Sequence, residues 1–527
     1  MTQIATVTNN YVIDLALNTI SIGKQALVFV NSKRSAEKTA EDLSRQIKNV
    51  VLNDLSEKML HALPKPTKQC ERLSKCIKNG IAFHHAGLVH KQKEMIEDEF
   101  RSGKIKVICC TPTLAAGVDL PAFRTIIKDL RRYSSRGLNW IPVLEYEQQA
   151  GRAGRPSYDD YGEAICIAVT DSSRKEIVKR YINGEVEEIY SKLAVEPVLR
   201  TYVLSLIASG FITSRNDLID FFSKTFYAYQ FKDMDKIKSI MDKMIHLLTK
   251  FEFIMKINHT EDDDSKNNEF TSANKLDEDN KNINYKATII GKRVAQLYID
   301  PLTANYLIKH VKLVNIKNEI SFLQLISHTS EIRPLLKVRN KDMEDVNEFL
   351  LRHNVFILEK EPEIYDSEYD EFLSSIKTSM FFYDWINEKD EEFLLDKYNT
   401  RPGEIKVKLD IADWLLYSTE ELCKLLKMHS VVKEIMKLRI RLQFGVREEL
   451  LGLLRLKNIG RVRARKLHYN KIKTIEDVKK CDLLKLVQIL GKKTAIDVKE
   501  QVGIKVDASK IIVKKNKRKG QISLLDY

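Results

Sequence analysis

Residues 144–156 read Leu-Glu-Tyr-Glu-Gln-Gln-Ala-Gly-Arg-Ala-Gly-Arg-Pro, and Gln148, Gly151, Arg152, Gly154 and Arg155 form a Q-x-x-G-R-x-G-R pattern. The two arginines are three residues apart, so at the start of a helix they project from one face. Guanidinium groups bind phosphate oxygens through paired hydrogen bonds, and glycines let the backbone approach closely. The pattern predicts a nucleotide-phosphate site, with Arg152, Arg155 and Gln148 as catalytic residues and Gly151 as a nucleotide contact. A glycine-rich helix start carrying two surface arginines is the alternative.

Around this stretch lie five short apolar runs, at residues 26–30, 81–84, 107–110, 125–127 and 164–168. They are continuous rather than alternating, which is typical of strands buried on both faces of a parallel sheet. The segments between them, such as 35–47 and 91–100, have helical spacing with polar faces. Residues 1–185 are therefore predicted to form a doubly wound α/β domain.

Turns with polar residues follow the first three runs. Asn31 follows the first, His84-His85-Ala86-Gly87 ends the second, and residues 111–121 (Thr-Pro-Thr-Leu-Ala-Ala-Gly-Val-Asp-Leu-Pro) follow the third. Hydroxyls and loop amides suit the phosphates of a nucleic acid or of ATP, although a purely structural turn is the alternative. No third ligand at usable spacing accompanies the two histidines, so no metal site is predicted. The predicted nucleic-acid contacts are Asn31, His85, Thr111 and Thr113, and the predicted nucleotide contacts are Gly117 and Asp119.

After residue 186 the predicted strands become rare. Helical stretches at 197–207, 218–226 and 237–248 precede strand-like pieces at 251–257 and 287–290, an order that fits a winged helix. Residues 258–284 are rich in Asn, Asp, Glu and Lys and are predicted to be disordered. The predicted units after the α/β domain are a winged helix (186–296), a helical bundle (297–430), a helix-hairpin-helix (431–503) and a basic tail (504–527).

The charge of the chain favours a polyanionic partner. It has 87 Lys and Arg against 73 Asp and Glu, a net charge of +14. Nucleic acid is the simplest such partner, because cations that replace its counterions gain affinity; a merely basic surface is the alternative. Seven cysteines without a C-x-x-C pair predict neither a zinc site nor disulfides, and hence a reducing, intracellular setting. The sequence shows no signal peptide and no apolar run of membrane-spanning length, so we expect a soluble protein.

With its motifs in this order, the chain resembles the C-terminal portion of the archaeal Hjm-type DNA helicases of superfamily 2, kin to the helicase part of animal polymerase theta. The resemblance runs from about residue 11 to the end. It implies that residues 1–185 are the second RecA-like domain of an ATP-dependent 3′–5′ DNA helicase. It also implies roles in fork repair and recombination, single-stranded and forked DNA as substrates, and a location in the archaeal cytoplasm with the nucleoid. Asp119 departs from the Asn that is usual in the family.

The family's ATP and Mg²⁺ are held mainly by a first RecA-like domain with a phosphate loop and an Asp-Glu box. No G-x-x-x-x-G-K-[ST] phosphate loop occurs in this sequence. The sequence therefore predicts a half-motor, inactive alone, whose partner chain supplies the first domain, or a fragment of a longer chain. A non-catalytic DNA-binding module and half of an RNA helicase are the alternative functions.

The resemblance implies further DNA contacts. Residues 132–145 correspond to a β-hairpin that parts the duplex, with Tyr133 and Trp140 as candidate wedges; both are otherwise core anchors. Residues 377–388 resemble the helix that ratchets along the translocated strand, with Lys377 on a phosphate and Trp385 on a base. A bundle helix with a buried aromatic face is the alternative.

Residues 459–467 (Ile-Gly-Arg-Val-Arg-Ala-Arg-Lys-Leu) carry a helix-hairpin-helix signature. Gly460 opens the turn and the amides of the next helix can hold a phosphate, to which Arg461, Arg463 and Arg465 add charge. In the tail, Gln521, Leu524 and Tyr527 have the spacing of peptides that bind the sliding clamp. The alternative is that these C-terminal residues pack on the helix-hairpin-helix unit of the same chain.

Overall fold

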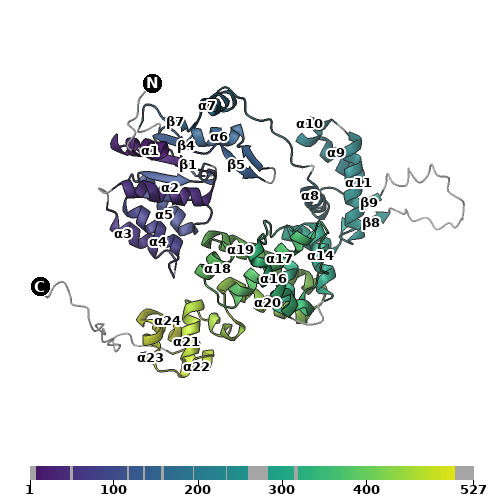
Figure 1. Cartoon of the computed structure of the whole chain (residues 1–527). Helices are drawn as coiled ribbons and strands as arrows, with labels where there is room; N and C mark the ends of the chain where they lie inside the picture. The colour runs from purple at the N-terminus through teal and green to yellow at the C-terminus, as the bar shows by residue number, and fades with distance from the viewer. Residues whose placement is uncertain are drawn as a thin grey trace, which may run out of the picture.

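The computed structural model describes residues 8–47, 51–63, 65–115, 118–134, 137–155, 159–193, 195–232, 234–258, 283–313 and 318–504. Within these residues the buried apolar side chains form three hydrophobic cores. The first lies in the N-terminal α/β domain, the second runs through the winged helix and the bundle, and the third lies in the C-terminal helices (Figure 1). The predicted fold class, a parallel α/β domain followed by mostly helical domains, is confirmed.

The α/β domain is built on a five-stranded parallel sheet with the order β2-β3-β1-β4-β7. Every residue of β1, β2, β3 and β4 is buried; β1 and β3 are apolar throughout, whereas β2 ends in the buried His84 and β4 begins with the buried Arg124 and Thr125. All five predicted strands are present. The strands are β1 (Ala26–Phe29), β2 (Ile81–His84), β3 (Val107–Cys110), β4 (Arg124–Ile127) and β7 (Glu163–Cys166).

Helices and one hairpin complete this domain. An antiparallel pair, β5 (Arg131–Ser134) and β6 (Gly137–Trp140), follows β4 directly. The segment from residue 183 to 195 then leads away to the winged helix without regular structure in its described residues (Figure 1). The helices are α1 (Tyr11–Ser21), α2 (Lys33–Gln46), α3 (Asn53–Leu60), α4 (Lys68–Lys78), α5 (His90–Arg101), η1 (Pro112–Leu114), α6 (Val143–Ala150), α7 (Asp171–Ile177) and the π turn η2 (Val178–Ile182).

The winged helix contains the predicted helices and a two-stranded wing, but its second strand lies earlier than predicted. Residues 287–290 were predicted as a strand, whereas β9 ends at Ala287 and Ile289 begins a helix. The reason is local: the Thr288 side chain accepts a hydrogen bond from Gly291 N and caps that helix. The disorder predicted for 258–284 falls mostly on residues 259–282, outside the described residues. The elements are α8 (Glu196–Ala208), α9 (Arg215–Ser223), α10 (Phe226–Phe231), α11 (Met234–Lys250), β8 (Ile254–Asn258), β9 (Ile283–Ala287) and α13 (Ile289–Leu297).

The bundle shares its core with the winged helix, because buried residues from Leu199 to Leu442 form one cluster. That cluster includes the buried face of the last bundle helix, which begins at His429. We therefore place the end of the bundle near Gly445 rather than at residue 430. Its helices are α14 (Pro301–Val311), α15 (Glu319–Ser327), η4 (Asn340–Asp342), α16 (Met343–His353), η5 (Asn354–Phe356), α17 (Tyr369–Ile386), α18 (Glu391–Tyr398), α19 (Pro402–Leu425) and α20 (His429–Phe444).

Short helices around the third core form the C-terminal unit: η6 (Glu448–Leu450), η7 (Leu453–Arg455), α21 (Arg461–Tyr469), α22 (Ile475–Lys480), α23 (Leu483–Leu490) and α24 (Lys492–Gln501). Residues 505–527, including the predicted clamp-binding residues Gln521, Leu524 and Tyr527, lie outside the described residues. In the part of the chain that is described, no helix has the length and hydropathy needed to cross a membrane.

The start of α19, in the bundle, contacts the α/β domain. Gly403 N donates to Gly87 O at 3.0 Å, joining the two backbones. A Cβ on Gly403 would lie 2.4 Å from Leu88 O and 2.5 Å from Ala86 O, so the approach requires glycine. The N-terminal end of the bundle's longest helix in the described residues is thus fixed to the turn after β2.

Candidate functional site

The arginine motif begins where α6 ends, so its two arginines lie in the turn after a helix and not, as predicted from the sequence, at the start of one. Arg152 donates to Ala115 O from two guanidinium nitrogens, at 2.6 and 3.2 Å, and lies 3.6 Å from an Asp119 carboxylate oxygen. Ala115 and Asp119 belong to the loop that connects β3 to β4. The structure therefore brings the two predicted nucleotide motifs together, with Arg152 and Asp119 in contact; Gly117 lies outside the described residues.

Arg155 is held by two buried groups. It donates to Asp159 Oδ2 at 2.8 Å and to Gln25 Oε1 at 2.7 Å. The Asp159 side chain is 1% exposed and also pairs with Lys24 Nζ at 2.6 Å. Burial alone would raise the pKa of Asp159, but the hydrogen bonds from Arg155 and Lys24 outweigh it and lower that pKa. The guanidinium is oriented by protein groups before any phosphate is bound.

Gln25 can present only one atom to Arg155. Its amide nitrogen donates to Phe100 O and Ile105 O, both at 2.7 Å, so its amide oxygen must face the guanidinium. Sequence reasoning missed Asp159 and Gln25. The i,i+4 spacing of Arg155 and Asp159 was a usable signal, whereas nothing near Gln25 in the sequence pointed to the arginine.

Glycine is required at one position of the motif. Gly154 has φ +93, a conformation that disfavours side chains, and its N donates to Ala122 O at 2.7 Å. A Cβ on Gly162 would meet Gly154 N at 2.2 Å, so the two glycines pack directly together. Gln148 and Gly151 are both exposed at the end of α6, open to an approaching molecule.

The predicted nucleic-acid contacts Asn31, Thr111 and Thr113 follow the carboxyl ends of β1 and β3. Asn31 and Thr113 are exposed and Thr111 is half-buried. The two threonine hydroxyls are 2.9 Å apart, and Asn31 Nδ2 donates to Arg131 O at 3.0 Å. This edge of the sheet therefore offers hydroxyl and amide groups next to the hairpin.

His85 requires a correction. Its side chain is fully buried, so it cannot touch DNA in this structure. Gly87 N donates to its Nδ1 at 3.1 Å, which leaves Nε2 to donate to Glu37 Oε1 at 3.2 Å. Arg401, at the start of α19, donates to the same Glu37 oxygen at 3.0 Å. His85 thus belongs to the contact between the α/β domain and the bundle.

In the hairpin, Tyr133 and Trp140 differ in environment. Tyr133 is 82% exposed, near the turn. Trp140 is partly buried, with the guanidinium carbon of Arg131 4.0 Å from its ring centre and that of Arg180 at 5.6 Å. Tyr133 is free to meet an unpaired base, whereas Trp140 is engaged at the base of the hairpin.

Lys377 also requires a correction. It is 3% exposed, and its Nζ donates to Asp342 Oδ2 at 2.7 Å and to Lys337 O at 2.9 Å. An ammonium committed to buried partners cannot hold a phosphate of bound DNA. The predicted alternative, a bundle helix with a buried face, describes α17 correctly at this position.

Trp385 is 8% exposed, and its Nε1 donates to Leu442 O at 2.7 Å. A Cβ on Gly445 would lie 2.8 Å from its ring, and the Arg461 guanidinium lies 5.2 Å from the ring centre. Most of the indole therefore packs at the junction between α20 and the C-terminal unit, which leaves little surface for the predicted stacking on a base.

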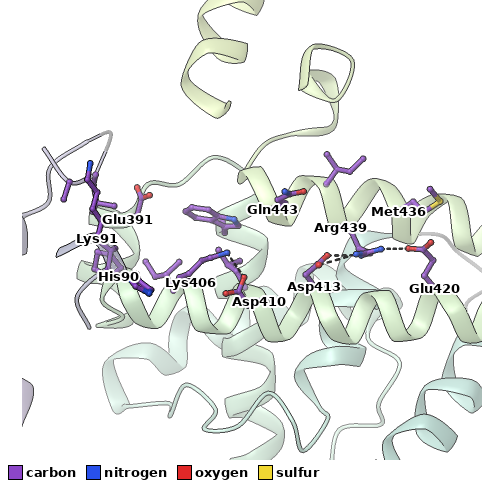
Figure 2. A pocket seen from close by; sticks show the side chains of 18 residues that line it. His90, Lys91, Glu391, Lys406, Asp410, Asp413, Glu420, Met436, Arg439 and Gln443 are labelled. Carbon is purple, nitrogen blue, oxygen red and sulfur yellow. Dashed lines mark hydrogen bonds and ion pairs between the residues drawn. The ribbon is translucent and has the colours of Figure 1, made fainter. Parts of the chain in front are cut away.

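The remaining edge of Trp385 borders a cavity of about 850 Å³ between the α/β domain, α19 and α20 (Figure 2). Along its wall Arg439 pairs with Asp413 and Glu420, and Lys406 pairs with Asp410. Arg439 and Lys406 are therefore neutralised by neighbouring carboxylates. Sequence reasoning gave no sign of it, because its lining comes from segments far apart in the chain.

The helix-hairpin-helix arginines divide into two groups. Arg465 pairs with Glu388 at the end of α17 and with Glu449, and Arg461 lies over Trp385. Arg463 is exposed, with a hydrogen bond to Asn458 O at 2.8 Å. Gly460 caps α21 and has open space around it. Arg463 and the Gly460 turn can meet DNA, whereas Arg465 is engaged in attaching this unit to the bundle.

Three family models match separate parts of the chain. A helicase conserved C-terminal domain covers residues 62–157, a helix-turn-helix domain 162–255, and an archaeal helicase domain 4 covers 320–445. These matches fall on the α/β domain, the winged helix and the bundle.

Similar proteins bear the name ATP-dependent DNA helicase Hel308. The protein of Methanococcus vannielii is 38% identical over 96% of this chain and 69% of its own length. Those of Methanocella arvoryzae and Pyrococcus horikoshii are both 36% identical, over 94% and 91% of this chain. The chain spans 65% and 64% of the length of these two relatives, about two thirds.

Proposed function

Because the chain belongs to the Hel308 family of DNA helicases, as its motifs predicted, we propose that it is the C-terminal part of an ATP-dependent 3′–5′ DNA helicase acting on forks and single strands. The observation that carries the proposal is the contact of Arg152 with the Ala115–Asp119 loop, beside an oriented Arg155. Two guanidinium groups at this spacing suit the terminal phosphates of ATP.

The residues present fit one side of a nucleotide site. The arginine side chains keep 22% and 20% of their surface exposed, so both can turn toward a phosphate. No phosphate loop occurs in the sequence, and we propose that the groups that hold the β- and γ-phosphates and Mg²⁺ come from polypeptide outside it. We propose a first RecA-like domain, on a partner chain or on a longer form of this one.

In the complete motor, a bound Mg²⁺ would be held by the first RecA-like domain and would supply positive charge to the phosphate oxygens. Arg155 and Arg152 add positive charge on the opposite side of the γ-phosphate, and the Asp159–Gln25 pair sets the resting position of Arg155. Arg152 connects the nucleotide site to the loop that begins with Thr111, so a change at the phosphates reaches the edge of the sheet assigned to DNA.

On the DNA side, we propose that Tyr133 parts the duplex while Asn31, Thr111 and Thr113 hold the backbone of one strand. Arg463 and the Gly460 turn bind the strand farther along. The net charge of +14 supports a polyanionic substrate. Binding of the tail to the sliding clamp, through Gln521, Leu524 and Tyr527, also stays a proposal.

The test is ATP hydrolysis with single-stranded DNA by the chain alone and by the chain mixed with a first RecA-like domain from a Hel308 relative. We expect turnover only in the mixture. Arg155→Ala should lower kcat in the mixture by about 10³-fold, as loss of an arginine finger does. Arg174→Ala is the matched control, since Arg174 lies on α7, outside the motif. Undiminished kcat in the Arg155 variant would refute its assigned role.

The non-catalytic alternative makes a different prediction in the same assay. DNA binding without turnover in any mixture would favour a DNA-binding module, and RNA-stimulated turnover would favour an RNA helicase. Turnover by the chain alone would refute the need for a second half.

A further inference from the structure

The side chain of Tyr181 contacts the base of the β5–β6 hairpin. The hairpin ends where Ile141 N donates to Leu130 O at 3.0 Å. The Tyr181 hydroxyl donates to Ile141 O at 2.7 Å and lies 3.4 Å from Leu130 O. Tyr181 is 1% exposed, so this hydrogen bond is shielded from water. Its position on the π turn η2 is notable, because π turns recur at functional sites.

The Tyr181 ring also joins the hairpin to α6. Its centroid lies 6.0 Å from that of Trp140 on β6 and 5.0 Å from that of Tyr146 on α6. Trp140 is covered in turn by Arg180, the residue before Tyr181. One π turn therefore contacts both the hairpin whose first strand carries the proposed wedge and the helix that leads to the arginine motif.

Glu187 holds the start of α6, next to the base of the hairpin. Its two carboxylate oxygens accept hydrogen bonds from Val143 N at 2.6 Å and Leu144 N at 3.1 Å, the first amides of α6. The hydrogen bond from Val143 N lowers the pKa of Glu187, and a negative charge at a helix N-terminus is favourable. Pro142 occupies the N-cap position and has no side chain that could cap the helix.

We propose that Tyr181 and Glu187 are positioning residues that lock the hairpin and α6 into one rigid unit at the start of the segment leading to the winged helix. Tyr133 near one end of this unit and the arginine motif at the other then keep a fixed relation. The proposal rests on the proposed function, because it assumes that the hairpin parts the duplex and that α6 presents the arginines.

The first test needs no DNA. Hydrogen exchange of the whole chain is compared for wild type, Tyr181→Phe and Tyr190→Phe. Tyr190 is the control, since it is 63% exposed and its hydroxyl donates only to neighbouring Glu188. Loss of one buried hydrogen bond should speed exchange at residues 131–141 about tenfold in Tyr181→Phe and leave it unchanged in Tyr190→Phe. Unchanged exchange at the hairpin in Tyr181→Phe would overturn the proposal.

Glu187→Gln gives an independent reading of the second residue. The amide retains one acceptor oxygen but no charge, so we expect faster exchange at the first turn of α6 and little change in the hairpin. Glu188→Gln is the matched control from the next position. Equal exchange of α6 in both variants would remove Glu187 from the proposal.

The second test measures opening of a fork. A forked duplex with 2-aminopurine at the first paired position is saturated with the chain, and its fluorescence reports unpairing. Tyr181→Phe should reduce the signal several-fold while affinity for single-stranded DNA and Tm stay unchanged, a separation that a general structural defect would not give. Wild-type opening in Tyr181→Phe would overturn the positioning role. Wild-type opening in Tyr133→Ala would instead refute the wedge assigned in the proposed function.

Discussion

Glu37 shows how one carboxylate can join two domains. It is 2% exposed, and besides His85 and Arg401 it accepts a hydrogen bond from Arg72 at 2.6 Å. Burial alone would raise the pKa of Glu37, but the hydrogen bonds of His85 and Arg401 and the charges of Arg401 and Arg72 lower it to about 2. The sequence did not reveal this role, because Arg401 lies 364 residues away along the chain.

The lowered pKa of Glu37 makes a prediction about stability and pH. In the unfolded chain this carboxyl titrates near 4.5, and in the native protein near 2, so its ionised form favours folding. Its contribution to the free energy of unfolding, on the order of 3 kcal/mol, is complete above about pH 4.5 and declines as the pH falls toward 2. Urea unfolding gives the free energies of unfolding of the wild type and of Glu37→Gln. The difference between these two free energies should be constant from about pH 7 to 5 and should become smaller at about pH 3.5. A difference independent of pH would contradict the assignment.

At the scale of elements, some sequence patterns predicted the secondary structure correctly and others did not. Strands β1 to β3 and the Ile126–Ile127 end of β4 were predictable because burial on both faces leaves a short apolar run. The wing strand was misplaced because Ile289 and Ile290 read as strand residues, while the preceding threonine caps a helix. In α17 Lys377 is followed by the apolar and aromatic residues 380–383, a sequence that fits both the buried and the DNA-facing interpretation. Only the structure showed that the lysine points inward.

The helix α21 gives a prediction that separates two arginines of one motif. Arg463 is exposed, whereas Arg465 is paired with Glu388 and Glu449. A cation that contacts a phosphate contributes about one unit to the slope of log K against log salt. Arg463→Ala should therefore lower the slope of log K against log salt for single-stranded DNA by about one. Arg465→Gln should leave that slope unchanged, although it removes the ion pairs that attach the C-terminal unit to the bundle. Fluorescence anisotropy between about 50 and 200 mM salt measures both, and equal slopes in the two variants would refute the division.

At the scale of the whole molecule, the order of the domains was predictable, but the contact between the α/β domain and the bundle was not. Residues between positions 33 and 87 of the α/β domain meet residues 390–404 of the bundle through ion pairs such as Lys68–Glu392 and through the Gly403–Gly87 backbone contact. Charge pairs between distant segments leave no periodic pattern in a sequence. Glycines at a backbone contact leave none either. The two domains have separate hydrophobic cores, so in the described residues these polar and backbone contacts connect the α/β domain to the bundle.

A substitution at Gly403 can test the contact between the α/β domain and the bundle. In an exposed helix alanine stabilises relative to glycine, so Gly403→Ala would be favourable if the contact were absent. Because its Cβ would meet two backbone oxygens within 2.5 Å, we expect the opposite, a loss of about 1–3 kcal/mol. Gly460→Ala is the control, since its Cβ would meet nothing within 4 Å. Urea unfolding should resolve a separate transition of the α/β domain in Gly403→Ala, and small-angle scattering should show a larger radius of gyration. A single transition at wild-type stability would mean that the two domains do not depend on this contact.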